Sequence, residues 1–248
     1  MLKAIKLVKE FGNYKAVNEV TLNIKKGEIY GFLGPNGAGK TTTIRMLTGT
    51  LKPTSGDVEI LNLNLFNNEL EIKRRIGVVP DEPKMYENLK GFEYIEFIMG
   101  IYKLNKDETK KRFDEICDAF EIDYLNNYIG DFSHGMKQKL MVASVLMRKP
   151  EVIFLDEPTV GLDARSAKIL KELLHKYRDE GMTIFLTTHI LEIAEKMCDR
   201  IGIIKEGRML AEGTIEELRN STENKGSLED IFLELTGDDS IEDVIKEL

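Results

Sequence analysis

The sequence predicts an α/β fold that combines a parallel sheet with a helical insert. Short apolar runs alternate with helical patterns in the second half of the chain, as they do in parallel α/β units. A glycine-rich loop joins an apolar run to a helical pattern just before Lys40. Between about Gly91 and Arg148, apolar residues recur at helical spacing alone, which indicates an insert of helices.

The N-terminal part is predicted to consist mainly of strands. Roughly the first 30 residues alternate between apolar and polar side chains, with turn signals at Gly12-Asn13 and Lys26-Gly27. Glu28–Leu33 is apolar enough to be a buried strand, and Pro53–Gly56 is a turn that precedes a strand at Val58–Ile60. These strands lie on either side of the glycine-rich loop and its helix.

Four more buried strands are predicted in the rest of the chain. They are Ile76–Val79, Val152–Leu155, Thr183–Leu186 and Ile201–Ile204. Helical patterns lie between the last three, so this half is expected to form a parallel sheet covered by helices. Lys205–Arg208 is typical of a hairpin turn.

Composition excludes several classes of protein. Apolar residues make up 42% and charged residues 31% of the 248 residues, as in globular proteins. No apolar run approaches the ~18–20 residues that cross a bilayer, and the N-terminus lacks the apolar core of a signal peptide. Cys117 and Cys198 are far apart in helical patterns, so we expect core thiols rather than a disulfide or a metal pair, and a cytosolic protein.

The acidic residues are concentrated at the C-terminus. Residues 221–248 contribute −7 to a net charge of −8, and we expect them to form a solvated pair of short helices. The remainder is close to neutral and shows no basic patch, so nucleic acid is not expected as a partner.

The glycine-rich loop predicts a site for a nucleoside triphosphate. It runs Gly34-Pro35-Asn36-Gly37-Ala38-Gly39-Lys40-Thr41-Thr42 and matches the pattern G-x-x-x-x-G-K-[ST]. Backbone N–H groups of such a loop surround phosphate oxygens, the Lys40 ammonium suits the outer phosphates, and the Thr41 hydroxyl suits Mg²⁺. An ordinary glycine-rich turn is the alternative, but a strand before the loop and a helix after it favour phosphate binding.

Two adjacent carboxylates, Asp156 and Glu157, follow the strand Val152–Leu155. Side chains at a strand end point in different directions, so the two acids should have different roles. Asp156 suits Mg²⁺, whereas Glu157 suits positioning and deprotonating a water that attacks the γ-phosphate. A solvated turn with two surface charges is an equally good explanation of the pair taken alone.

Two other positions are candidates for phosphate contacts. Ser133 is a good N-cap for a helix that runs to about Arg148, and its hydroxyl, the Gly135 amide and the helix dipole suit an anion. A capped helix without a ligand is the alternative. His189 is the last residue of a strand that runs from Thr183, in the same half as the carboxylates, which directs it toward the phosphate edge of the sheet, although a lone histidine is usually structural.

The order and spacing of these motifs resemble the ATP-binding subunit of an ABC (ATP-binding cassette) transporter. The motifs are the glycine-rich loop, F-S-H-G-M-K-Q, I-F-L-D-E-P, G-L-D-A and T-T-H, and the resemblance extends from the N-terminal strands to at least Gly213. Leu228–Gly237 also looks like the tail of ABC-2-type exporter subunits. The resemblance implies a P-loop NTPase with a mixed β core, an antiparallel β subdomain and an inserted helical subdomain.

The same resemblance implies boundaries and roles. The ATPase domain would span residues 1–220, with the helical subdomain at about 88–150 and an acidic helical tail at 221–248. The phosphate-binding residues would be Asn36, Gly37, Ala38, Gly39, Lys40, Thr41 and Thr42. Asp156 would help to hold Mg²⁺, Glu157 would be the general base, and His189 would contact the γ-phosphate of ATP.

Other residues would bind the base of ATP or act between two copies. Phe11 looks like the aromatic that the family stacks on adenine, with Tyr14 in reserve and simple strand packing as the alternative. Ser133 and Gly135, with His134 between them, would bind ATP held by the other chain. Asp163 would cross the dimer interface.

The sequence departs from the family pattern at two positions. His134 replaces a glycine of the usual Leu-Ser-Gly-Gly. If the backbone there needs a positive φ, a Cβ costs of order 1 kcal/mol. The alternative is that a protonated imidazole at this position helps to bind the anion. Asp81 replaces a glutamine. A carboxylate only accepts hydrogen bonds, so Asp81 is expected to reach Mg²⁺ or its water.

As a whole, the resemblance implies the motor subunit of a transporter. The chain would form a homodimer on ATP binding, hydrolyse ATP with Mg²⁺, and drive transport, with export expected, through an integral membrane permease at the inner face of the cell membrane. Candidate contacts with that permease are Met85, Tyr86, Phe97, Met99 and Tyr102, unless they form the core of the insert. The alternative function is a soluble, non-transport ABC ATPase that acts as a nucleotide-dependent clamp. Such proteins usually have two cassettes or a long heptad insertion, which this chain lacks.

Overall fold

Two β-sheets organise the chain in the computed structural model, which describes residues 1–221 and 227–237. The strands are β1 (Leu2–Phe11), β2 (Tyr14–Ile24), β3 (Ile29–Leu33), β4 (Ser55–Ile60), β5 (Leu63–Asn64), β6 (Ile76–Val79), β7 (Val152–Asp156), β8 (Thr183–Thr188), β9 (Arg200–Lys205) and β10 (Arg208–Gly213). The larger sheet has the order β10-β9-β3-β8-β7-β6 and is parallel except for β10. The smaller sheet, β2-β1-β4-β5, is antiparallel. The predicted fold class is confirmed.

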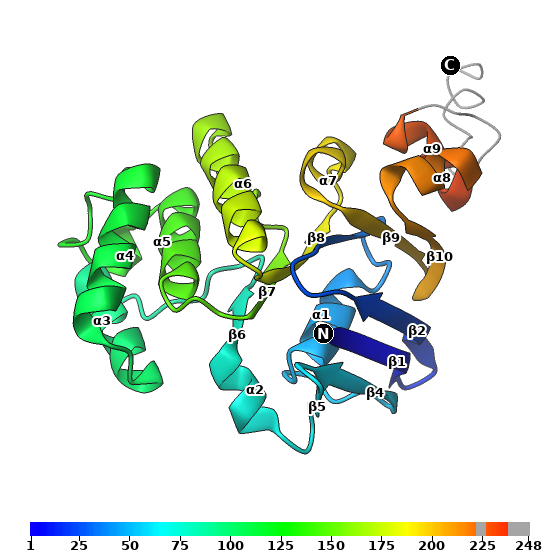
Figure 1. Ribbon diagram of the computed structural model, residues 1–248, viewed down its shortest axis with the longest axis horizontal. Coiled ribbons are helices and arrows are strands. Elements are labelled where there is room, and N and C mark those ends of the chain that lie inside the picture. The colour runs from blue at the N-terminus through cyan, green and yellow to red at the C-terminus, as the bar shows by residue number, and fades with distance from the viewer. Residues whose placement is uncertain (222–226, 238–248) are drawn as a thin grey trace.

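Helices cover the larger sheet and form a separate group beside it (Figure 1). They are α1 (Lys40–Leu47), α2 (Glu69–Arg75), α3 (Gly91–Tyr102), α4 (Lys106–Phe120), α5 (His134–Leu146), α6 (Ala164–Asp179), α7 (Leu191–Met197), α8 (Ile215–Ser221) and α9 (Leu228–Thr236), with a 3₁₀ turn η1 (Ile129–Asp131). Figure 1 shows α3, α4 and α5 at the β6 side of the larger sheet, away from the smaller sheet. The helices expected between Gly91 and Arg148 are therefore present.

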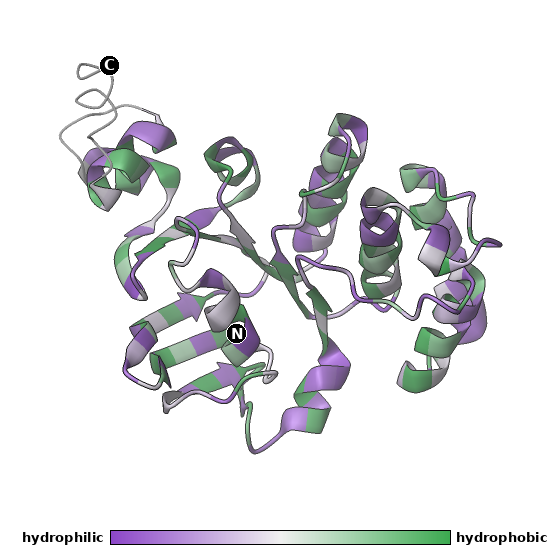
Figure 2. Ribbon diagram, turned by 180° about the vertical axis from the view of Figure 1, so that it is seen from behind, coloured by the Kyte–Doolittle hydropathy of each residue, from purple (hydrophilic) through white to green (hydrophobic). Residues whose placement is uncertain are grey.

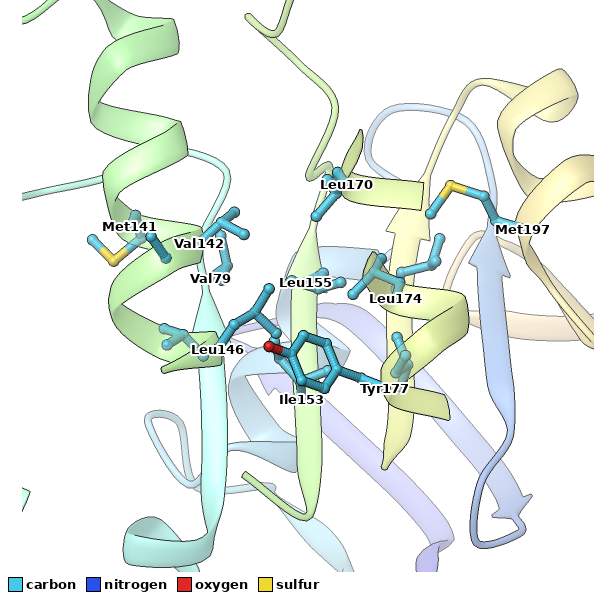
Figure 3. Packing of buried hydrophobic residues seen from close by; sticks show 14 of the residues in the cluster. Val79, Met141, Val142, Leu146, Ile153, Leu155, Leu170, Leu174, Tyr177 and Met197 are labelled. Carbon is cyan, nitrogen blue, oxygen red and sulfur yellow. The ribbon is translucent and has the colours of Figure 1, made fainter. Parts of the chain in front are cut away.

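The larger sheet separates two hydrophobic clusters. Ile153 and Leu155 of β7 belong to the cluster under α5 and α6, whereas Phe154 of the same strand belongs to the cluster on the side of α1 and the smaller sheet. This alternation follows from the period of two along a strand. Figure 3 shows the first cluster, where Leu170, Leu174 and Tyr177 of α6 face β7 and Leu146 of α5. Because both faces are covered, every residue of β3, β7 and β8 is buried, and the central strands are largely green in Figure 2.

Arg148 connects the helical group to the sheet. Its guanidinium carbon lies 3.3 Å from the centroid of the Tyr102 ring, and its Nη2 donates to the backbone oxygen of Ile76 at 2.8 Å. Burial lowers the pKa of Arg148, and the aromatic ring and carbonyl compensate for part of the lost solvation. This side chain therefore fixes the end of α3 against the start of β6.

The structure also bears on the expectations for the cysteines, for membrane-spanning helices and for the C-terminal tail. Cys117 and Cys198 are both free and buried, as predicted, and burial raises the pKa of Cys117 to about 12. Within residues 1–221 and 227–237, every helix is too short or too polar to cross a membrane. Helix α9 falls in the predicted helical tail and α8 reaches its start, while residues 222–226 and 238–248 of that tail lie outside the described part of the chain.

We predict that Phe185→Ala destabilises the protein strongly. Phe185 is fully buried, and its ring centroid lies 5.9 Å from Tyr30, 5.5 Å from Phe32 and 5.9 Å from Phe154. Such a truncation removes aromatic packing and leaves a cavity, so we expect a loss of about 3–5 kcal/mol and a melting temperature lowered by roughly 6–20 °C. Thermal unfolding followed by circular dichroism measures this. The control Leu70→Ala removes an exposed side chain and should change stability by less than about 0.5 kcal/mol; equal losses would contradict the prediction.

Candidate functional site

The glycine-rich loop lies between the end of β3 and the start of α1. Other parts of the chain pack closely against its backbone. Gly37 and Gly39 have φ angles of 80° and 105°, which favour glycine. A Cβ on Gly39 would lie only 2.5 Å from the backbone oxygen of Ala16, and Gly207 N donates to the oxygen of Ala38 at 3.0 Å. The loop is thus supported by β2 and by the hairpin turn between β9 and β10.

Lys40 holds its ammonium inside this loop. Its Nζ donates to the backbone oxygens of Gly34 at 2.6 Å and Pro35 at 3.2 Å, and only 7% of its side chain is exposed. Desolvation lowers the pKa of Lys40, while the negative charges of Glu157 and Asp156 oppose the shift. A buried cation surrounded by backbone dipoles of the loop is suited to a multiply charged anion.

Asp156 and Glu157 are held by a residue of the neighbouring strand, Thr187. Its hydroxyl donates to Asp156 Oδ1 at 2.5 Å and accepts from the backbone N–H of Glu157 at 3.2 Å. The register of the parallel pair explains this contact, because Asp156 lies opposite Thr187. Glu157 itself has a φ of 48°, a conformation that costs a non-glycine residue about 1–3 kcal/mol and is concentrated at functional sites.

The Glu157 carboxylate lies between two potential proton or charge partners. Its Oε1 is 3.0 Å from Nδ1 of His189 and 3.9 Å from Nζ of Lys40, and its Oε2 accepts from the His189 backbone N–H at 3.3 Å. Only 12% of the Glu157 side chain is exposed, compared with 50% for His189. The structure therefore brings the loop lysine, the acid and the histidine together, although they come from three different strand ends.

Two adjoining clefts contain most of the predicted site residues. One of about 350 Å³ is lined by Phe11, Tyr14, Ala16, Asn36, Gly37, Ala38, Gly39, Lys40, Thr41, Thr42, Asp81 and Glu157. The other, about 820 Å³, includes Thr41, Asp81 and Asp156, the three predicted metal ligands. Desolvation, together with the charges of Asp156 and Glu157, raises the pKa of Asp81. These oxygen donors suit a hard cation such as Mg²⁺.

The aromatic position remains open between two residues. Phe11 and Tyr14 pair across the β1–β2 hairpin, line the same cleft, and are 50% and 59% exposed. Lys9 Nζ lies 5.2 Å from the centroid of the Phe11 ring. Either ring is available for stacking on a base, so the geometry favours neither over the other.

The remaining predicted residues line neither of these two clefts. Ser133 caps α5 and accepts from Met136 N at 3.2 Å, and its side chain is exposed. Asp163 caps α6 and accepts from Ser166 N at 2.8 Å, and the hydrogen bonds from Ser166 lower the pKa of Asp163. The His134 ring lies against Gly161. Within one copy, these residues form a second group beside the clefts.

Thr187 was missed at the sequence level. The available signal was a polar pair, Thr187-Thr188, at the end of an otherwise apolar strand, directly before His189. Gln138 belongs to the motif F-S-H-G-M-K-Q, but no role was predicted for it from the sequence. It is fully buried and its Nε2 donates to the backbone oxygen of Pro158 at 3.4 Å.

Comparison with known proteins is consistent in sequence and in structure. The sequence model of the family described as ABC transporter matches residues 17–160. The chain is 42% identical to the bacitracin transport ATP-binding protein BcrA of Bacillus licheniformis, over 88% of this chain and 71% of that protein. It is 37% identical to the ABC transporter ATP-binding protein NatA of Bacillus subtilis, over 88% and 89% of the two chains.

Solved structures show the same relationship. One described as an ATP-binding subunit of an ABC transporter has a TM-score of 0.91 and 31% identity, covering 95% of this chain and 99% of that chain. The dimeric ATP-binding cassette MJ0796 bound to ADP and Pi has a TM-score of 0.75 and 29% identity, over 86% and 98% of the two chains.

We predict that Gly39→Ala destabilises the protein more than Gly37→Ala. Both residues have positive φ, so both variants carry backbone strain of about 1 kcal/mol. Only a Cβ at residue 39 would collide with the Ala16 oxygen, whereas nothing lies within 4 Å of a Cβ at residue 37. We expect a further loss of about 1–3 kcal/mol for Gly39→Ala in thermal unfolding without nucleotide. Equal melting temperatures would show that the support behind the loop is unimportant.

Proposed function

The chain belongs to the ABC transporter family as an ATP-binding subunit, and we propose that it hydrolyses ATP in a cleft that a second copy completes. It is an ATPase that powers transport together with a membrane permease. The observation that best supports the proposed site is the position of Glu157, which lies between Lys40 and His189 in the cleft formed by the phosphate loop.

In this proposal, the phosphates of ATP lie in the loop from Asn36 to Thr42. The loop N–H groups and the Lys40 ammonium bind the phosphate oxygens, and Phe11 or Tyr14 stacks on the adenine. The Thr41 hydroxyl and the Asp156 carboxylate hold Mg²⁺, with Asp81 at the same cleft as a further oxygen donor. When bound, the ion neutralises negative charge that develops on the transferred phosphoryl group.

Glu157 is proposed as the general base and His189 as its positioning partner and γ-phosphate contact. The carboxylate accepts from the His189 backbone, so its orientation is fixed before any substrate arrives. The strained φ of Glu157 turns this side chain out of the strand alternation and into the cleft. Little covalent chemistry is required of the protein, because positioning and charge account for most catalysis of phosphoryl transfer.

The second copy is proposed to contribute Ser133, Gly135 and Asp163. These residues lie at the N-termini of α5 and α6, where free N–H groups and the helix dipole favour anions. They line neither cleft of their own chain, and MJ0796, a related cassette, is dimeric with ADP and Pi bound. Two ATP molecules would then lie between two chains arranged head to tail. Hydrolysis of ATP would allow the two chains to separate.

The membrane partner is proposed to contact the exposed aromatic residues of the helical insert. Tyr86 is 62% and Phe97 42% exposed, and their ring centroids lie 5.5 Å apart. Met85 and Met99, in contrast, pack against the core, and Tyr102 lies beneath Arg148, so these three are weaker candidates than expected. An ion pair of 2.8 Å between Glu87 and Lys137 links this surface to α5.

The direction of transport, the location of the subunit in the cell and the domain boundaries are also proposals. Relatives of this chain are described as serving bacitracin transport, linearmycin resistance and daunorubicin resistance, which supports export. We place the subunit on the inner face of the cell membrane, held there by its permease. The ATPase domain is proposed to span residues 1–220, with the helical subdomain at about 88–150, before the acidic tail.

We predict that Glu157→Gln binds MgATP but hydrolyses it at least about 100-fold more slowly, because an amide cannot take the proton from water. The variant should accumulate as a nucleotide-bound dimer on gel filtration. Phosphate release measures turnover, and a filter-binding assay measures affinity. Glu180→Gln, which changes an exposed acid on the loop before β8, is the control and should match the unaltered protein. Turnover of Glu157→Gln at the control rate would remove Glu157 as the base.

We predict that Asp81→Gln retains ATPase activity within about threefold, if Asp81 fulfils the role of the glutamine found in the family. Without nucleotide it should also be slightly more stable at pH 7. The raised pKa of Asp81 means that its ionised form is disfavoured in the folded protein. This penalty is present at neutral pH, decreases as the pH falls through the raised pKa, and is absent below the ordinary pKa of an aspartate. Asp81→Asn, which keeps the side-chain length, is the control. Loss of activity in Asp81→Gln alone would indicate a need for the shorter side chain, and loss in both would indicate a need for the carboxylate.

A further inference from the structure

The N-terminal end of α5 packs against the turn that follows Glu157. A Cβ built on Gly161 would lie 2.2 Å from Cδ2 and 2.9 Å from Nε2 of His134, so the imidazole ring rests directly on this glycine. A Cβ on Gly135 would lie 2.6 Å from the Gly161 oxygen. One helical turn further along α5, the Gln138 amide donates to the oxygen of Pro158 at 3.4 Å. Three side-chain or backbone contacts thus join one face of α5 to the turn.

This turn is short and contains two internal hydrogen bonds. Val160 N donates to the oxygen of Glu157 at 3.1 Å, and Leu162 N donates to the oxygen of Thr159 at 3.2 Å. Glu157, with a φ of 48°, begins the turn, and Gly161, with a φ of 78°, lies near its end. Asp163 follows directly as the N-cap of α6. A shift of Gly161 would therefore reach both Glu157 and Asp163.

His134 is an exposed residue. A solvent-exposed ring contributes little to the hydrophobic core, so its contact with Gly161 affects position more than global stability.

We propose that His134 is a positioning residue of its own chain, whose imidazole seats on Gly161 and fixes the turn between Glu157 and Asp163. Glycine, which the family has at this position, offers no side chain for such a contact. The inference rests on the proposed role of Glu157 as the base. It assigns the ring of His134 to the catalytic turn in cis, beside any contact that the backbone of this segment makes with ATP of the other copy.

A double-mutant cycle of His134→Ala and Gly161→Ala tests this contact. In the presence of His134, the new Cβ at residue 161 should push the ring and the turn, and kcat should fall about 10-fold or more while KM for ATP changes less than about threefold. In the His134→Ala background the same Gly161→Ala change should cost less, by a factor of about five. Backbone strain at residue 161 and any loss of a contact with the other copy occur in both backgrounds and cancel.

A control variant, thermal unfolding and the single variant His134→Ala complete the test. The control Gly237→Ala places a Cβ at another positive φ, with no atom of the described residues within 4 Å, and should leave kcat unchanged. Additive effects on kcat overturn the inference, as does coupling that appears in thermal unfolding but not in kcat. If Gly161→Ala folds only together with His134→Ala, that rescue is the expected coupling. If it folds in neither background, His134→Ala alone decides, because an unchanged kcat overturns the inference.

The result is separable from the proposed function. An additive cycle together with an inactive Glu157→Gln rejects the contact and keeps the base. A coupled cycle together with a fully active Glu157→Gln rejects the base, and with it the positioning of that base by His134.

Discussion

The hydroxyl of Thr187 connects the two acids of the proposed catalytic site, Asp156 and Glu157. It donates to the Asp156 carboxylate and accepts from the backbone N–H of Glu157, and it is completely buried. A hydroxyl can do both at once, whereas a methyl group of similar shape would leave the buried carboxylate without this donor. The Glu157 N–H would keep the backbone oxygen of Thr187, at 3.2 Å, as its acceptor. Because the contact joins the ends of β7 and β8, the parallel register of the sheet decides where both acids point.

The buried charges of Lys40 and Glu157 are each stabilised by neighbouring polar groups. Lys40 and Glu157 are both nearly buried, and an isolated buried ion costs several kcal/mol. Lys40 offsets this cost through two loop carbonyls and Glu157 through His189, so neither depends on the 3.9 Å distance between them alone. That distance leaves the ammonium free to bind an anion. A tighter pair would stabilise the empty site at the expense of its ligand.

Much of the fold was predictable because the strands are short apolar runs that end in polar motifs. The phosphate loop, Asp156, Glu157 and His189 each follow such a run, and parallel strands bring their carboxyl ends to one edge. Helix α2 was not predicted, since seven residues are too few to show helical periodicity. The choice between Phe11 and Tyr14 stays open because a two-residue hairpin places both on one cleft. The contact of His134 with Gly161 was not predictable either, since it joins segments that no local pattern relates.

In the proposed dimer, the contact of His134 with Gly161 would connect the two ATP sites. Ser133 and Asp163 are the N-caps of α5 and α6, and both are proposed to act on the other copy. The ends of these two helices meet where the His134 ring rests on Gly161, four residues after Glu157. The surface proposed to serve the neighbour's ATP is therefore built on the same turn as Glu157, the base proposed to act on the chain's own ATP. In such an arrangement we expect closure of one site to be coupled to the geometry of the other, because the connecting segment is short and internally hydrogen-bonded.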